Sequence, residues 1–144
     1  MNKNKLLNRA VEIAANAHLN LQDKNGDPYI GHIFRVMNMG KTMDEKICGA
    51  LHDLIEDTNW TFEKLEKEGF PEEIISALKC LTKESEDENY DHFISRISKN
   101  ALAVRVKIND LIDNLDVKRF TVITEKDMNR TNKYLKAYRQ LIEK

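Results

Sequence analysis

Cysteine, proline and glycine are scarce in this sequence of 144 residues, which contains two, two and five of them. Cys48 and Cys80 both lie inside apolar helical patterns, which argues against a disulfide framework and suits reduced thiols in the cytoplasm. No apolar run approaches the roughly 20 residues needed to cross a bilayer. The opening Met-Asn-Lys-Asn-Lys stretch lacks the apolar core of a signal peptide. We therefore expect a cytoplasmic protein without a membrane partner.

An excess of charge of either sign is also absent. Lys and Arg total 23 and Asp and Glu total 24, which gives a net charge of −1 with neutral histidines. This balance provides no electrostatic reason to expect a nucleic-acid partner. Hydrophobic residues make up 41% of the chain, which is enough for a packed core. Since the length is close to that of one folding unit, we expect a single domain over residues 1–144.

Apolar residues recur with a helical period throughout, and no stretch alternates as a strand does. Turn formers at 23–28 and a polar run at 83–89 separate periodic segments. Thr42, Thr61 and Asn100 stand where helix N-caps are expected. These features predict an all-α bundle of about seven to eight helices. Its periodic apolar segments lie at 7–21, 33–37, 47–55, 62–65, 74–78, 90–97, 101–115 and 134–142.

Four polar residues are woven into the apolar segment at 47–55 and just beyond it. His52 and Asp53 can both reach an ion beside the helix, and Glu56 and Asp57 follow them by four residues on the same wall. Crowded carboxylates repel one another unless a cation or protons neutralise them. One interpretation is a metal site, and the other is an ordinary solvated helix face.

Two residues elsewhere could complete a metal site. Asp110 lies beside core positions of the long helix at 101–115, where a lone acid is uncommon without a partner. His32 begins the second helix, directly after a turn. A fold that packs the second, third and long helices together would bring both side chains to the point that His52 and Asp53 reach.

Five short segments form a pattern that is weak in any one part and specific as a whole. They are Ala-His at 17–18, Lys-Asn-Gly-Asp-Pro-Tyr-Ile-Gly-His at 24–32, Ala-Leu-His-Asp-Leu-Ile-Glu-Asp-Thr at 50–58, Leu-Thr-Lys at 81–83 and Lys-Ile-Asn-Asp-Leu-Ile-Asp-Asn at 107–114. In this order and spacing the chain resembles HD-domain metal-dependent phosphohydrolases. Among these it is similar to the hydrolase domains of RelA/SpoT homologues and to small alarmone hydrolases. The resemblance covers most of the chain and implies a single HD-type helical bundle.

The resemblance also implies which residues form the active site. The metal ligands would be His32, His52, Asp53 and Asp110. Two nitrogens with hard oxygens and no thiolate suit a divalent metal, with Mn²⁺ favoured. Glu56 and Asp57 would be the catalytic acids that orient and deprotonate a metal-bound water for attack on phosphorus.

In that family the substrate is a purine nucleotide that carries a diphosphate on its ribose. The resemblance therefore implies a guanosine-3′,5′-bis(diphosphate) 3′-pyrophosphohydrolase-like activity on a small nucleotide, with release of pyrophosphate. Substrate contacts would come from Lys24, Asn114, Arg130 and Tyr134. For Lys24, Arg130 and Tyr134 an ordinary surface or packing role is an equal alternative.

Three positions depart from the family pattern. Asp23 stands where an arginine usually precedes the lysine, Leu111 replaces another arginine, and Asp113 adds an acid. These changes keep two alternatives open. One is the same chemistry on another nucleotide or pyrophosphorylated substrate, and the other is a non-catalytic nucleotide-binding regulatory module.

Overall fold

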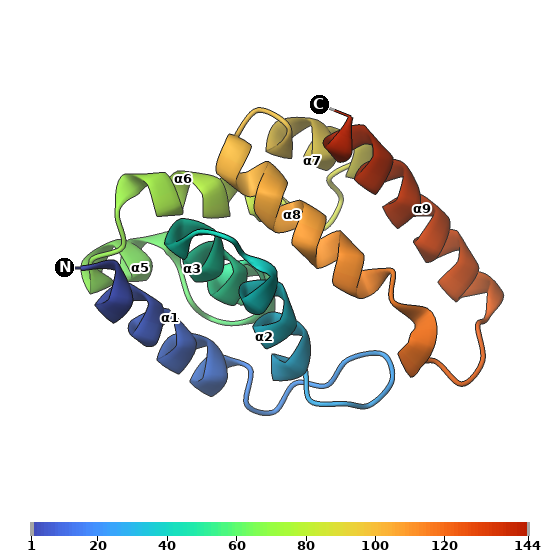
Figure 1. The fold of residues 1–144 in the computed structure, drawn as a ribbon, viewed down its shortest axis with the longest axis horizontal. Coiled ribbons are helices and arrows are strands. Elements are labelled where there is room, and N and C mark those ends of the chain that lie inside the picture. The colour runs from blue at the N-terminus through green and yellow to red at the C-terminus, as the bar shows by residue number, and fades with distance from the viewer. Residues whose placement is uncertain (1, 144) are drawn as a thin grey trace.

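The computed structural model describes residues 2–143, and in this range the regular structure is helical without a named strand. This confirms the all-α class expected from the sequence. If the one-turn α4 is left out, residues 2–143 contain eight α-helices. This number agrees with the seven to eight helices expected (Figure 1). The elements are α1 (Lys3–Ala17), α2 (Ile30–Met39), α3 (Met43–Leu51), α4 (Leu54–Asp57), α5 (Phe62–Glu68), α6 (Glu72–Leu81), α7 (Tyr90–Ile97), α8 (Ala101–Asn114), the 3₁₀ helix η1 (Val117–Arg119) and α9 (Glu125–Ile142).

Side-chain caps define where several helices begin. Thr42, Thr61 and Asn100 each accept a hydrogen bond from a backbone N–H in the first turn, as the sequence predicts. The last helix begins well before its apolar segment at 134–142, because Thr124 and Asp127 form a reciprocal capping box at its start. A cap satisfies N–H groups that otherwise lack a partner, so these residues fix the helix boundaries.

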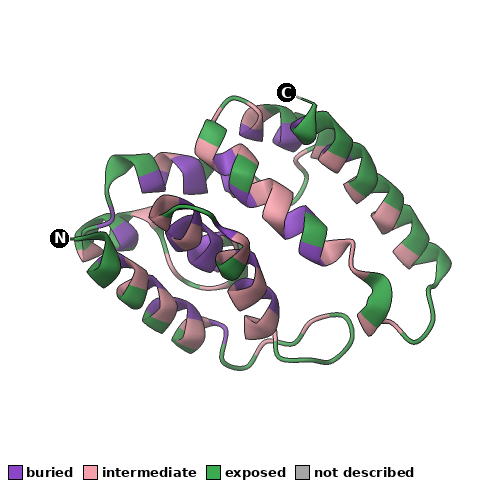
Figure 2. Cartoon of the chain, in the orientation of Figure 1, coloured by how far each residue is buried: buried purple, intermediate pink, exposed green. Residues whose placement is uncertain are grey.

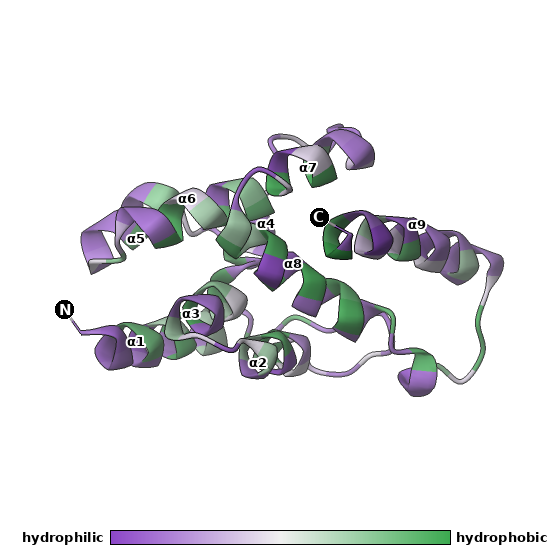
Figure 3. Cartoon of the chain, turned by 45° about the horizontal axis from the view of Figure 1, so that its top comes forward, coloured by the Kyte–Doolittle hydropathy of each residue, from purple (hydrophilic) through white to green (hydrophobic). Residues whose placement is uncertain are grey.

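Helix α3 lies at the centre and packs against α1, α2, α6 and α8. In Figure 3, α8 runs between a group formed by α1, α2 and α3 and a group formed by α5, α6 and α7. Buried residues concentrate on α3 and on the inner sides of α6 and α8, whereas α9 is exposed over much of its length (Figure 2). The protein core is therefore built around α3, and α9 covers α8 from outside.

Glycine permits the close approach of α2 to α3. A Cβ atom added to Gly49 would lie 3.0 Å from Met37 Cα and 3.1 Å from Met37 N. These are backbone atoms that cannot move aside as a flexible side chain can. The missing side chain at Gly49 thus lets α2 and α3 pack closely, and these helices carry His32 and lead into His52.

Both cysteines are free, as the sequence predicts. Cys48 is buried in the core, and burial raises the pKa of its thiol. Cys80 is partly buried against the same core. No helix within residues 2–143 has the length and apolar character that a membrane span requires.

Candidate metal centre

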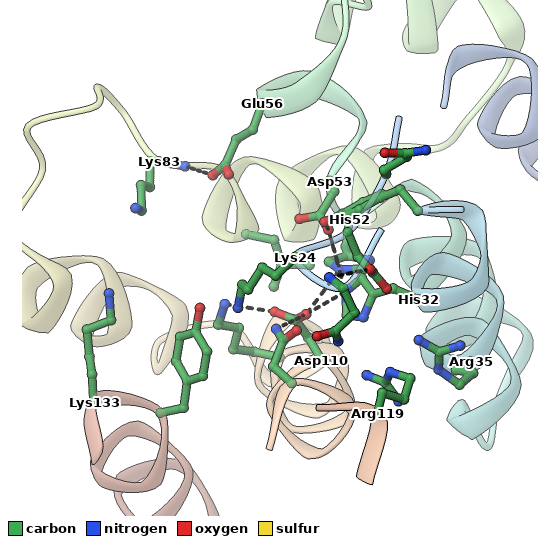
Figure 4. Close-up of a pocket in the computed structure, with 18 of the residues that line it drawn as sticks. Lys24, His32, Arg35, His52, Asp53, Glu56, Lys83, Asp110, Arg119 and Lys133 are labelled. Carbon is green, nitrogen blue, oxygen red and sulfur yellow. Dashed lines mark hydrogen bonds and ion pairs between the residues drawn. The ribbon is translucent and has the colours of Figure 1, made fainter. Parts of the chain in front are cut away.

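His32, His52, Asp53 and Asp110 converge at one point, and we call this cluster the candidate metal centre. One potential ligand atom from each lies within 4.8 Å of the others. His52 Nε2 is 3.0 Å from Asp53 Oδ2 and 3.3 Å from Asp110 Oδ1. His32 Nε2 is 3.0 Å from the same Asp110 atom and 3.6 Å from Asp53 Oδ2 (Figure 4). The sequence predicts this spatial convergence, and the structure contains it.

A break in the helix places two of these residues. The sequence pattern suggests one continuous helix from Thr42 to Asp57, but α3 ends at Leu51 and α4 begins at Leu54. Of the two residues between them, His52 keeps α-helical dihedral angles (φ −62°, ψ −28°), and the helix breaks at Asp53, which has φ −105° and ψ 1°. Their side chains therefore lie at a corner between α3 and α4, facing His32 from α2 and Asp110 from α8.

Hydrogen bonds behind the two imidazole rings orient them. His52 Nδ1 lies 2.7 Å from the backbone oxygen of Gly49, and His32 Nδ1 lies 2.7 Å from Asp113 Oδ2. Since each of these acceptors takes the Nδ1 proton, both Nε2 atoms could offer a lone pair to a cation beside Asp53 and Asp110. Without a cation, burial would lower the pKa of His32, but hydrogen bonds to Asp110 and Asp113 outweigh burial and raise this pKa to about 8. His52 Nε2 is buried and has no hydrogen-bond partner within the described chain. These donors fit a divalent cation.

Both carboxylates of the centre are also held from behind. Asp53 Oδ2 accepts a hydrogen bond from the Tyr29 hydroxyl group. Asp110 lies 2.9 Å from Lys107 Nζ and 3.0 Å from Asn114 Nδ2. Burial by itself would raise the pKa of Asp110, but the Lys107 ammonium and the nearby imidazoles hold that pKa well below its usual range. The pKa of Asp53 is likewise lowered, because the imidazole charge outweighs burial. Both acids are therefore anionic.

A cavity of about 300 Å³ opens beside the candidate metal centre. Figure 4 shows Lys24, Lys83 and Lys133 on one side of the centre and Arg35 and Arg119 on the other. Six cationic and four acidic side chains line this cavity, together with aromatic rings and polar groups. The charged residues are Lys24, Arg35, Lys83, Lys107, Arg119 and Lys133, with Asp23, Asp53, Glu56 and Asp110. Such a lining suits a polyanionic ligand.

Three of the four sequence-predicted substrate residues line this cavity: Lys24, Asn114 and Tyr134. Lys24 Nζ lies over the Tyr134 ring, 5.6 Å from its centroid. Arg130 does not belong to the lining, and its guanidinium pairs with Asp127. Lys133, from the same helix, faces the cavity instead (Figure 4).

Of the expected acid pair, one member lines the cavity and the other does not. Glu56 lines the cavity, and its Oε1 accepts the backbone N–H of Lys83 at 2.7 Å. Asp57 is exposed and lies outside the lining. Partial desolvation, followed by repulsion from Asp53 and Glu56, raises the pKa of Asp57 to about 6. The two acids therefore interact electrostatically but occupy different environments.

Sequence reasoning assigned no role to Tyr29, Lys107, Asp113 or Lys133. Tyr29 lies in the motif at 24–32 and Lys107 in the motif at 107–114, each three residues before His32 or Asp110. This spacing is the sequence feature that could have indicated a role for them. Asp113 appears in the sequence only as a departure from a family pattern. Tyr29 and Asp113 contact the centre across segments that are distant in the sequence, which a linear pattern does not specify. Lys107 pairs with Asp110 within α8, and Lys133 lines the cavity.

The loop after Lys83 is stabilised by a network of ion pairs and hydrogen bonds around Glu88. Its carboxylate lies 2.7 Å from Arg96 Nε, 2.8 Å from Arg96 Nη2 and 2.7 Å from His92 Nδ1, and it accepts the backbone N–H of Glu84. Arg96 also donates to the backbone oxygen of Thr82. The network closes residues 82–88 into an ordered loop beside the cavity.

We expect Glu88→Gln to lower the free energy of unfolding by about 1 kcal/mol near neutral pH, since it weakens charge-assisted hydrogen bonds. Hydrogen bonds from Arg96 first, and from the neighbouring groups, lower the pKa of Glu88 from 4.5 to about 2. A depressed pKa stabilises the fold above pH 4.5 and loses this contribution as the pH falls through about 2. Thermal unfolding followed by circular dichroism from pH 2 to 7 measures the effect.

The matched control is Glu86→Gln, at an exposed position in the same loop. It should unfold as the wild type does across this range. The Glu88→Gln curve should approach the wild-type curve at the acid end. A constant difference at every pH would contradict the ionic origin of the stabilisation.

The chain is similar in sequence to several proteins of known name. No family model matches the chain. A guanosine-3′,5′-bis(diphosphate) 3′-pyrophosphohydrolase of Borreliella burgdorferi is 34% identical over 139 residues, which cover 89% of this chain and 20% of the relative. One with the same name from Aquifex aeolicus is 29% identical over 120 residues, covering 76% of this chain and 17% of the relative. The chain thus spans about a fifth of the length of these curated relatives.

A solved structure gives an independent comparison of the fold. It is described as a metazoan orthologue of SpoT that hydrolyses ppGpp. The TM-score is 0.79 at 21% sequence identity, and the match covers 94% of this chain and 84% of that one. The sequence relatives and the shared fold together support an HD-domain protein similar to the RelA/SpoT hydrolases.

Proposed function

We propose that this protein is a metal-dependent phosphohydrolase that removes pyrophosphate from the 3′ position of guanosine-3′,5′-bis(diphosphate). The observation that carries the proposal is the convergence of two imidazoles and two carboxylates beside a cation-lined cavity. The names of the sequence relatives and of the structural neighbour support this substrate. We further propose that residues 1–144 act as one domain in the cytoplasm. One shared core and free thiols support this proposal.

The proposed cofactor is a divalent cation held by His32, His52, Asp53 and Asp110, with Mn²⁺ favoured. Two nitrogens and two carboxylate oxygens form a mixed donor set that suits borderline divalent metals. When bound, the cation would polarise a phosphoryl oxygen and offset its negative charge. The hydrogen bonds of the two imidazoles to Gly49 and Asp113 keep the ligand nitrogens directed toward it.

Glu56 is our proposed proton acceptor for the attacking water. The backbone N–H of Lys83 holds its Oε1, which leaves Oε2 to receive the proton from a water beside phosphorus. Asp57, whose pKa is raised to about 6, would pass that proton on to solvent. In-line displacement requires no covalent enzyme intermediate, so positioned acids and cations are sufficient for this chemistry.

The substrate would lie between the candidate metal centre and α9. Lys24 and Lys133 would bind phosphate oxygens, and the Tyr134 ring between them would contact an apolar part of the nucleotide. Asn114 would hydrogen-bond the ribose region while it steadies Asp110. Arg130 would reach a phosphate only by releasing its ion pair with Asp127, and we assign it a peripheral role.

A second candidate substrate is another pyrophosphorylated nucleotide. Asp23 lines the cavity and brings negative charge near the position proposed for phosphate. Its Oδ1 accepts the backbone N–H groups of Asn25 and Asp27, so this carboxylate also shapes the loop that carries Lys24. Leu111 is fully buried in the core and makes no contribution to the cavity lining.

The test is an assay of purified protein with Mn²⁺ and a panel of nucleotides, in which released pyrophosphate and orthophosphate are measured separately. We expect pyrophosphate from guanosine-3′,5′-bis(diphosphate) and no turnover by Asp53→Ala. Pyrophosphate from a different nucleotide alone would favour the second candidate. Orthophosphate alone would contradict a pyrophosphohydrolase, and equal rates for wild type and Asp53→Ala would leave only a non-catalytic binding module.

A further inference from the structure

Asp113 is a buried acid that lies behind the candidate metal centre. Its side chain is 4% exposed, and its Oδ2 lies 2.7 Å from Nδ1 of His32, whose side chain is 6% exposed. Asp113 does not line the cavity. It therefore acts through His32 and not by contact with a ligand in the cavity.

Two arginines fix the Asp113 carboxylate. Arg35 Nε lies 2.7 Å from Asp113 Oδ1, and Arg35 Nη2 lies 3.2 Å from Oδ2. Arg119 Nη2 donates to the backbone oxygen of Asp113 at 3.2 Å and lies 3.6 Å from its Oδ2. A two-point contact of this kind sets the plane of the carboxylate as well as its position. The acid consequently presents Oδ2 to His32 in one orientation.

The two histidines of the centre have different partners on their far sides. His52 faces a neutral acceptor, the backbone oxygen of Gly49, whereas His32 faces an anionic one. A carboxylate behind a ligating imidazole fixes its tautomer and makes the ligating nitrogen more basic. The His32 nitrogen that faces Asp53 and Asp110 is Nε2.

We propose that Asp113 is a positioning residue that holds His32 with its proton on Nδ1 and its Nε2 lone pair directed at a divalent cation. Arg35 and Arg119 hold Asp113 in turn. This inference rests on the proposed metal site. Under this inference, the departure from the family pattern at Asp113 serves cation binding. It does not determine which substrate is bound.

The first test measures Mn²⁺ affinity by electron paramagnetic resonance of the free ion, with wild type, Asp113→Asn and Asp116→Asn. An asparagine side chain in place of Asp113 cannot accept from His32 and from the Arg35 fork as a carboxylate does, so we expect about 10- to 100-fold weaker binding. Asp116→Asn removes the same charge three residues away, where Asp116 contacts Arg119 and caps η1. It should change the affinity less than twofold, on the order of measurement error.

The second test uses the wild type alone, so it does not depend on whether a variant folds. Nitrogen-15 NMR of the histidine rings is recorded without metal and with Zn²⁺ as a diamagnetic probe. In the Zn²⁺-loaded state we expect His32 to keep its proton on Nδ1 and to show a Zn²⁺-induced shift at Nε2. In folded metal-free Asp113→Asn, the His32 signals should indicate a mixture of tautomers.

Equal Mn²⁺ affinity of wild type and folded Asp113→Asn would overturn the inference, and so would a His32 proton on Nε2 in the Zn²⁺-loaded wild type. Either result leaves the proposed metal site intact, provided that the wild type binds Mn²⁺. If the wild type binds neither Mn²⁺ nor Zn²⁺, the proposed function fails and the inference fails with it. Weaker binding by Asp113→Asn alone, with Nδ1 protonated in the wild type, supports the inference.

Discussion

Asp110→Asn should abolish detectable Mn²⁺ binding and reduce hydrolysis by about 10³-fold or more, because a metal contributes several kcal/mol to stabilising the transition state. The variant loses an anionic donor at the centre of the cluster. It also leaves the Lys107 ammonium, 2.9 Å from this carboxylate in the wild type, without a counter-charge. An incoming cation would then meet a repulsive charge. Calorimetric titration with Mn²⁺ and the pyrophosphate assay measure the two effects.

The same substitution should destabilise the fold by about 3 kcal/mol, since breaking a buried ion pair leaves one charge uncompensated. The double variant Lys107→Met with Asp110→Asn is the matched control. Removing both charges should restore most of the free energy of unfolding without restoring Mn²⁺ binding. If Asp110→Asn binds Mn²⁺ as the wild type does, Asp110 is not a ligand.

Leu54→Ala should lower the free energy of unfolding by about 3 kcal/mol and the melting temperature by about 10 °C. Leu54 is fully buried and starts α4, directly after Asp53. Its truncation leaves a cavity beneath the corner that carries His52 and Asp53. Urea unfolding of the metal-free protein measures the loss.

Leu19→Ala is the control for this core substitution. Leu19 is 75% exposed, so its truncation should change stability by no more than about 0.5 kcal/mol. Saturating Mn²⁺ should recover part of the Leu54→Ala loss, because a ligand that binds only the folded state shifts the unfolding equilibrium. Equal stability of the two variants would show that α4 is not anchored through Leu54.

Local sequence patterns predict the helical class and several of the helix caps. Caps such as Thr42 and Asn100 depend on interactions within a few residues, so local rules identify them. The meeting of His32, His52 and Asp110 required a further step. Motif order and family resemblance indicated which helix faces come together, which periodicity alone does not.

Contacts between distant helices explain what could not be predicted. Asp113 and His32 are 81 residues apart in the sequence, and the Arg35 contact to Asp113 spans 78. Apolar spacing continues through His52 and Asp53, so it gives no sign that the helix breaks there. A motif also leaves the rotation of α9 undetermined, and that rotation directs Lys133 toward the cavity while Arg130 pairs with Asp127.

The lining of the cavity is positive even though the whole chain carries a net charge of −1. On the rest of the surface, positive and negative charges largely cancel in their effect on a mobile anion. In the cavity, lysine and arginine outnumber the acids, and the concave wall concentrates their positive field at the opening. Capture of a multiply charged nucleotide should therefore be accelerated at low ionic strength. Its association rate should fall steeply as added salt shortens the screening length to roughly 8 to 10 Å.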